Sequence, residues 1–267
     1  MTIILLYWAF VTLQLNLNSV LSGENKEHTF LGSSENLTSH AACLNFHEIR
    51  STSFNISVQV STNLTIGSGT ITGRAESTYF VLTSKHVLQG TTPPYTVQTS
   101  DGYRYSADVI SNSNLENMDV VFLVFASPLI YYTFAEFIAA NNIGLGDKVY
   151  AAGFLLYPSR HESSQLSSYL ENQFVVREGN ISRVLDRPLE NGYRLAYTSS
   201  VDLGMSGGPI LNCNGQMVGI NSLRDDPIWE MPMRYEDGTL PDEQTQSLIG
   251  RSSLAILVEE LMYALSQ

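Results

Sequence analysis

The chain has 267 residues, and its 14 basic and 26 acidic side chains give a formal net charge of −12. Hydrophobic residues make up 43% of the chain and charged residues only 15%, which excludes a disordered chain and allows one large domain or two small ones. The acidity argues against nucleic acid and against an anionic membrane surface as partners.

The chain begins with an apolar segment that predicts export. The run from Ile3 to Leu13 is interrupted only by Thr12. It has the length of a signal-peptide core, and a membrane-spanning helix needs about 20 apolar residues. We therefore expect a signal peptide over 1–22, a secreted or periplasmic protein, and no stable membrane insertion after processing. The alternative is a buried strand or helix at the start of the fold.

A polar segment precedes the first predicted strand. Residues 23–50 are rich in Gly, Ser, Asn and Glu, which predicts a loosely ordered N-terminal segment. From Phe54 to Val60 apolar and polar residues alternate, in the period-two pattern of a half-buried strand. Short β-rich runs then follow between turns such as Asn191-Gly192. They cover 69–72, 78–83, 95–99, 103–110, 120–125, 148–152, 174–176, 193–198, 209–211 and 217–220.

Helical patterns are rare. One stretch from Thr133 to Ala140 can be helical, and Val258 to Leu265 has apolar residues at helical spacing. Gly144 to Asp147 resembles a connector between two halves of the chain. Many short strands without alternating helices predict an all-β barrel or sandwich.

The two cysteines, Cys43 and Cys213, allow two interpretations. They form a disulfide that ties the N-terminal segment to the body, or they are buried free thiols. The sequence has no CxxC and no cluster of Cys with His, so we expect no metal site and no cofactor.

The strongest local signal is the glycine-rich segment from Gly204 to Pro209, which surrounds Ser206. Glycines permit tight turns that direct successive N–H groups into one small space, beside a nucleophilic hydroxyl. The alternative is an ordinary β-turn. The segment also fits the nucleophile elbow of α/β-hydrolases, but that family places its histidine after the serine, and all five histidines here precede Ser206.

A serine nucleophile needs a base, and the base needs an orienting carboxylate. His86 ends an apolar strand pattern and is the best base, although it can also be a surface-loop histidine. Asp119 immediately precedes the apolar run 120–125, so we expect its carboxylate to be at least partly buried and to need a hydrogen-bond donor.

With His86, Asp119 and Ser206 in this order, the chain resembles the trypsin-like (chymotrypsin-fold) serine peptidases. The segments 67–70 and 214–221 complete the pattern, and the resemblance covers about residues 50–260. It is closer to the bacterial Deg/HtrA-like and cyanobacterial trypsin-like peptidases than to animal trypsins.

The resemblance implies two antiparallel six-stranded β-barrels with the active site between them. The first barrel would occupy 51–140, and the second, with a short C-terminal helix, 141–267. His86 would act as general base and then acid, Asp119 as its orienter, and Ser206 as the nucleophile that forms an acyl-enzyme with a protein or peptide substrate.

The same resemblance assigns an oxyanion hole and exposes departures from the family. The backbone N–H groups of Gly204 and Ser206 would bind the oxyanion. Met205 stands where animal trypsins carry an aspartate, so we expect no zymogen activation by that route. Only 61 residues follow Ser206, which leaves no room for a PDZ domain. A polar insert over 224–247 covers the cleft, binds substrate, or is a plain surface loop.

The residues that set specificity are less well defined. The candidates for the primary pocket are Ser200, Asp202, Ser222 and Arg224. The sequence thus favours a serine endopeptidase, and the competing hypothesis is a catalytically silent trypsin fold used for binding. It does not define an oligomeric state.

Overall fold

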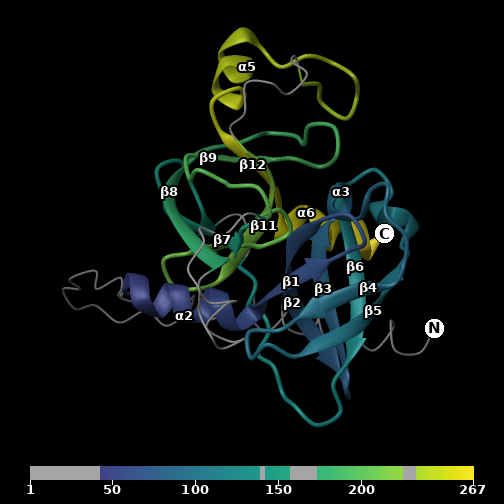
Figure 1. The fold of residues 1–267 in the computed structure, drawn as a ribbon. Coiled ribbons are helices and arrows are strands. Elements are labelled where there is room, and N and C mark those ends of the chain that lie inside the picture. The colour runs from purple at the N-terminus through teal and green to yellow at the C-terminus, as the bar shows by residue number, and fades with distance from the viewer. Residues whose placement is uncertain (1–42, 139–141, 157–172, 225–232) are drawn as a thin grey trace, which may run out of the picture.

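The computed structural model of the chain describes residues 43–138, 142–156, 173–224 and 233–267 (Figure 1). Its named strands form two closed six-stranded barrels. Within each barrel, every pair of neighbouring strands is antiparallel. The prediction of an all-β chain with two antiparallel barrels is therefore confirmed. The predicted signal peptide and most of the predicted loose N-terminal segment lie outside the described residues.

The first barrel has the strand order β1-β2-β3-β6-β5-β4. Its strands are β1 (Ser57–Ser61), β2 (Ile66–Ala75), β3 (Thr78–Ser84), β4 (Tyr95–Gln98), β5 (Arg104–Ile110) and β6 (Val120–Ala126). Inward-facing side chains such as Val58, Val81 and Leu123 fill its interior and are fully buried. Strand β3 pairs with β6 along its whole length, from Thr78↔Ala126 to Ser84↔Val120. The end of β3 therefore lies beside the start of β6.

The second barrel has the order β10-β11-β12-β9-β8-β7. Its strands are β7 (Lys148–Phe154), β8 (Phe174–Val184), β9 (Leu195–Tyr197), β10 (Pro209–Asn212), β11 (Met217–Leu223) and β12 (Ser253–Leu257). The connection between β8 and β9 turns at Asn191 and Gly192, both with positive φ, as the Asn-Gly pair predicts.

One apolar cluster includes residues of both barrels. Phe80, Leu82 and Phe122 come from the first barrel, and Leu211 and Ile220 come from the second. All five are at most 4% exposed. Burial of each such side chain contributes about 1.5–3 kcal/mol, so this cluster holds the two barrels against each other.

The helices differ in part from the predictions. The described helices are α2 (Phe46–Ile56), α3 (Lys85–Leu88), the 3₁₀ turn η1 (Ser113–Leu115), α5 (Glu243–Ile249) and α6 (Val258–Ser266). Helix α6 confirms the predicted C-terminal helix. The expected helix from Thr133 is wrong over residues 133–138, because their backbone groups pair with strands instead. The N–H groups of Ala135 and Ile138 donate to the carbonyls of Ile71 and Met217.

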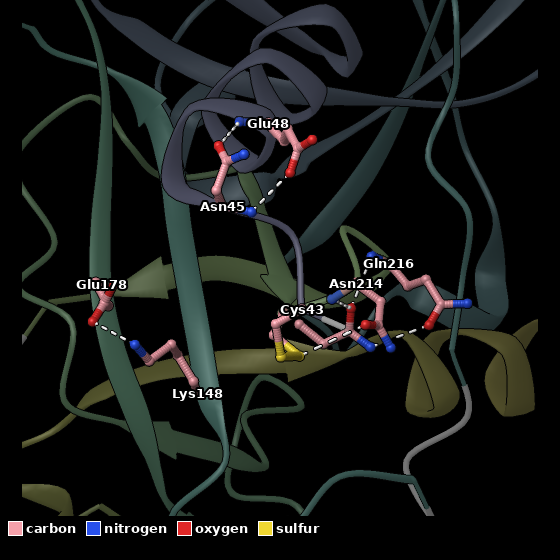
Figure 2. Close-up of a disulfide and its surroundings, with 9 residues drawn as sticks. Cys43, Asn45, Glu48, Lys148, Glu178, Asn214 and Gln216 are labelled. Atoms are coloured by element: carbon pink, nitrogen blue, oxygen red, sulfur yellow. Dashed lines mark hydrogen bonds and ion pairs between the residues drawn. A yellow bond between two sulfur atoms is a disulfide. The ribbon is translucent and has the colours of Figure 1, made fainter. Parts of the chain in front are cut away.

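Helix α2 corrects two predictions near the N-terminus. Residues 46–50, assigned to the loose segment, form its first half, and the expected strand from Phe54 begins only at Ser57. A capping box starts the helix: the Asn45 side chain accepts from the Glu48 N–H, and the Glu48 carboxylate accepts from the Asn45 N–H (Figure 2). These bonds satisfy N–H groups that a helix start leaves unpaired.

Helix α2 precedes the first barrel in sequence but is fastened to the second. Cys43 and Cys213 form a disulfide, the first of the two interpretations of these cysteines (Figure 2). The Leu44 N–H donates to the Cys213 carbonyl, and Ile49 packs in a cluster with Phe154 of β7. Among the described residues, no helix has the length and apolarity that a membrane crossing requires.

Candidate active site

The strand pairing described above brings His86 and Asp119 together. His86 lies in α3, directly after β3, and Asp119 directly precedes β6. The His86 Nδ1 atom is 2.7 Å from Asp119 Oδ2, and the His86 backbone N–H donates to Asp119 Oδ1 at 2.9 Å. The Asp119 side chain is 7% exposed, whereas that of His86 is 37% exposed. A buried carboxylate thus holds one edge of an accessible imidazole.

A third residue, Tyr193, contacts the same carboxylate and was missed by the sequence analysis. Its hydroxyl donates to Asp119 Oδ2 at 2.9 Å, and it lies in the connection between β8 and β9. Burial first, and then the charge of Asp119, raise the pKa of the Tyr193 hydroxyl well above its usual value. The hydroxyl therefore stays protonated and remains a donor. Its position just after the Asn191-Gly192 turn is the only sequence signal it carries.

Ser206 contacts β2, and the following residue, Gly207, lies against the end of β3, which leads to His86. The Ser206 carbonyl accepts from the Ser68 N–H at 2.9 Å. A Cβ atom on Gly207 would lie 2.4 Å from Thr83 Oγ1 and 3.0 Å from the Ser84 nitrogen, so only glycine permits this approach. The Ser206 hydroxyl donates to the Ser222 carbonyl at 3.3 Å. Among the described residues, no hydrogen bond joins Ser206 to His86.

Hydrogen bonds to two backbone carbonyls fix the orientation of the peptide groups around Ser206. The Leu203 carbonyl accepts from the Leu156 N–H at 2.8 Å, and the Met205 carbonyl accepts from the Gly208 N–H at 3.0 Å. Because C=O and N–H point in opposite directions in a trans peptide, the N–H groups of Gly204 and Ser206 face away from these bonds. Within the described part of the chain, neither N–H has a protein acceptor. Such a pair can bind an oxyanion.

A cavity of about 1270 Å³ opens beside the imidazole. His86, Asp119 and Tyr193 contribute to its lining, together with Met233 and Arg234 from the predicted insert. Residues 225–232 of that insert lie outside the described residues. The part that follows them lines the cavity, whereas Ser206 does not, so the cavity lies on the Asp119 side of the imidazole.

The four specificity candidates do not line this cavity. Asp202 pairs with Arg177 at 2.7 Å on the surface. Ser222 is buried, with its hydroxyl 3.4 Å from that of Ser84 and its carbonyl facing Ser206. Ser200 is exposed, and Arg224 is half-buried at the end of a described segment. Of these residues, only Ser222 contacts Ser206 directly.

Comparisons with known proteins agree with the fold and identify the family. A family model for a trypsin-like peptidase domain matches residues 67–220. The periplasmic pH-dependent serine endoprotease DegQ of Escherichia coli is 26% identical over 157 residues, which cover 59% of this chain and 31% of DegQ. The serine protease Do-like HtrA of Bacillus subtilis is 27% identical over 166 residues, with 59% and 33% covered. The chain thus spans about a third of the length of these curated relatives.

A solved structure supports the fold independently. The structure of an HtrA-type protease with a tripeptide matches with a TM-score of 0.59 and 17% identity, over 84% of this chain and 63% of the other. At this identity the likeness concerns the fold alone. The family model, in contrast, spans more than half of the chain, including the segments of His86, Asp119 and Ser206. The chain belongs to the family of trypsin-like peptidase domains.

Proposed function

We propose that this chain is an exported serine endopeptidase that cleaves protein or peptide substrates with Ser206, His86 and Asp119. The observation that carries the proposal is the 2.7 Å contact between His86 Nδ1 and the buried Asp119 carboxylate. This contact defines the tautomer, because the Nδ1–H that donates to Asp119 leaves Nε2 as an acceptor. The imidazole is therefore ready to take a proton on its other edge.

In the proposed reaction each of these residues has one role. Ser206 Oγ attacks the substrate carbonyl while His86 Nε2 accepts the hydroxyl proton, and Asp119 stabilises the resulting imidazolium. The N–H groups of Gly204 and Ser206 receive the oxyanion. His86 then gives its proton to the leaving amine as the C–N bond breaks. Water, activated in the same way, hydrolyses the acyl-enzyme and restores the Ser206 hydroxyl.

The hydrogen bond of the Ser206 hydroxyl to the Ser222 carbonyl favours the competing hypothesis of a silent binding module. Catalytic hydrogen bonds often form only when substrate is present. A chemical test of nucleophilicity distinguishes the two hypotheses.

The test is covalent labelling of the purified chain with a fluorophosphonate near neutral pH, with the modified residue located by peptide mass spectrometry. We expect stoichiometric modification of Ser206 that disappears in Ser206→Ala and in His86→Ala. The exposed residues Ser106 and His47 provide matched controls, and Ser106→Ala and His47→Ala should label normally. A folded chain that does not label would contradict the proposal and support the binding module.

Export is proposed on separate grounds. The relative from Escherichia coli is named periplasmic, and a disulfide such as Cys43–Cys213 persists in oxidising compartments. Amino-terminal sequencing of the chain after secretion should give a mature start near residue 23. Retention of residues 1–22 would contradict the signal peptide.

A further inference from the structure

We propose that Tyr193 is a positioning residue that fixes the Asp119 carboxylate from the opposite barrel. The inference rests on the proposed function, because it concerns the same imidazole–carboxylate pair. Tyr193 does not reach the reacting atoms and acts only through Asp119.

The Asp119 carboxylate accepts hydrogen bonds from residues of both barrels. Oδ1 accepts the His86 backbone N–H at 2.9 Å. Oδ2 accepts both the His86 Nδ1–H at 2.7 Å and the Tyr193 hydroxyl at 2.9 Å. Tyr193 is 4% exposed and Asp119 is 6% exposed, although both line the cavity beside the imidazole. Without the tyrosine, every remaining donor to this side chain in the described residues comes from His86 itself.

Other hydroxyls near the site are engaged elsewhere. The Ser84 hydroxyl donates to the Asn221 carbonyl at 3.0 Å and lies 3.4 Å from the Ser222 hydroxyl. The Ser222 carbonyl faces Ser206. Neither serine contacts Asp119, which leaves Tyr193 as the side chain from outside α3 that holds the carboxylate in the described residues.

The backbone holds Tyr193 close to Asp119. The Asp119 N–H donates to the Asn191 carbonyl at 2.9 Å, and Met118 and Asn191 form an isolated bridge. Gly192 lies against Met118, whose Cε would be 3.1 Å from an added Cβ. The turn at 191–192 therefore contacts the main chain of Asp119 while Tyr193 contacts its side chain, and the two contacts fix the hydroxyl in place.

Residues of the insert contact the segment that leads into this turn. The Glu190 N–H donates to the Arg234 carbonyl at 2.8 Å. Arg187 stacks on the Tyr235 ring at 3.9 Å and pairs with Asp237. The turn that carries Tyr193 is thus held between the first barrel and residues 233–240, so the hydroxyl cannot easily move away from Asp119.

If Tyr193 only positions Asp119, its loss should lower the rate of labelling at Ser206 and leave the binding of the probe unchanged. A carboxylate that loses a buried donor can rotate, and the imidazole then spends less time in the orientation that accepts the Ser206 proton. For Tyr193→Phe we expect a loss of about tenfold in the maximal rate of fluorophosphonate labelling, with little change in the half-saturating concentration.

Tyr79 provides the matched control. It is a fully buried tyrosine of the first barrel, and its hydroxyl accepts the Tyr132 N–H, far along β3 from His86. Tyr79→Phe removes the same atom and also leaves the partly buried Tyr132 N–H without this partner, but it should label within about twofold of the unaltered chain. Thermal unfolding of both variants shows whether the fold is retained.

A spectroscopic measurement separates this inference from the proposed function. The His86 Nδ1 proton, bonded to a carboxylate, should give a downfield proton resonance that is absent from His86→Ala. We expect this resonance to shift or broaden in Tyr193→Phe and to stay unchanged in Tyr79→Phe. In the unaltered chain, a nuclear Overhauser contact should join the His86 Nδ1 proton to the Tyr193 hydroxyl proton. This measurement does not depend on the folding of any variant.

The outcomes are distinct. If the unaltered chain does not label but the resonance responds to Tyr193→Phe, the proposed function fails and the positioning role stands. If Tyr193→Phe labels at the rate of the unaltered chain and leaves the resonance in place, Tyr193 is only a packing residue and the inference is wrong. Absence of the Overhauser contact in the unaltered chain would overturn it as well.

Discussion

The hydroxyl of Ser68, in the first barrel, donates a 2.7 Å hydrogen bond to the carbonyl of Gly204, beside Ser206 in the second. The same hydroxyl accepts the Phe154 N–H at 2.8 Å. The Ser68 N–H in turn donates to the Ser206 carbonyl at 2.9 Å. One fully buried serine therefore ties the Ser206 segment both to β2 and to the end of β7.

Replacement of this serine should affect both stability and activity. Ser68→Ala leaves the Gly204 carbonyl and the Phe154 N–H without their buried partner, at a cost of about 1–3 kcal/mol in the free energy of unfolding. We also expect slower labelling of Ser206, because its segment loses a fixed point. Urea denaturation and labelling kinetics measure the two effects.

Ser57 supplies the control for that prediction. It is also fully buried, but its hydroxyl has no hydrogen-bond partner in the described residues. Ser57→Ala should therefore be neutral or stabilising. Equal losses of stability in the two variants would mean that the Ser68 hydrogen bonds contribute little.

Gly207 tests the close approach of the two barrels. Its φ is +86°, and an added Cβ would lie 2.1 Å from the Ser68 carbonyl oxygen. Gly90 also has a positive φ, of +72°, but an added Cβ there meets nothing within 4 Å. Gly90→Ala should cost about 1–2 kcal/mol from backbone strain alone. Gly207→Ala should cost clearly more in the same denaturation experiment and should abolish labelling, whereas similar costs would argue against the close approach.

Removal of the disulfide should lower the stability of the chain and leave labelling at Ser206 intact. Its cysteines are 170 residues apart in sequence, so its loss should lower the free energy of unfolding by about 2–5 kcal/mol. It lies at the tip between β10 and β11, while Ser206 precedes the opposite end of β10. A Cys43→Ser, Cys213→Ser chain should thus unfold at lower urea concentration and still label at Ser206 in buffer. Loss of labelling in a folded double variant would show that α2 supports the active site.

Acid should loosen helix α5 at the end of the insert. The Asp242 side chain caps α5 by accepting the Thr245 N–H at 2.8 Å, and this bond, followed by that of the Thr245 hydroxyl, lowers the pKa of Asp242. A carboxylate with a lowered pKa stabilises the fold above its ordinary pKa, which is about 3.9, and the contribution is lost as the pH falls through the lower, folded value. No change is expected between pH 7 and about 4, and α5 should fray below that range.

Hydrogen exchange of the Thr245 amide, corrected for its intrinsic pH dependence, measures this fraying. Asn caps helices about as well as Asp but does not titrate, so Asp242→Asn should keep its protection at low pH. If both chains lose protection at the same pH, another group controls the transition.

The sequence could predict an all-β chain because its strands carry strong local patterns, whereas the division into two barrels came from the resemblance to trypsin-like peptidases. The apolar runs of β3 and β6, which end beside His86 and Asp119, stand out without knowledge of their partners. Helix α2 was missed because residues 54–60 alternate like a strand, and its capping box, formed by Asn45 and Glu48, is evident only in the structure. In this case a helix cap outweighed a short alternating pattern.

Contacts between the two barrels could not be predicted from the sequence. Tyr193 is 74 residues from Asp119, and nothing in its neighbourhood marks it as a partner of a carboxylate. The hydrogen bonds of Ser68 to Phe154 and Gly204 are equally remote. Such pairs are created by the docking of the barrels, which no local pattern specifies.

The attachment of α2 to the second barrel has a consequence for biosynthesis. All pairings of the first barrel fall within residues 57–126, so that barrel has its strands as soon as they leave the ribosome. Cys43 and Ile49 are made earlier, but their partners on the second barrel follow much later. At about 5–20 residues per second, the 170 residues from Cys43 to Cys213 take on the order of 10–35 s. Helix α2 is therefore made before all the described strands but can be fastened by its disulfide only after Cys213 has been translated.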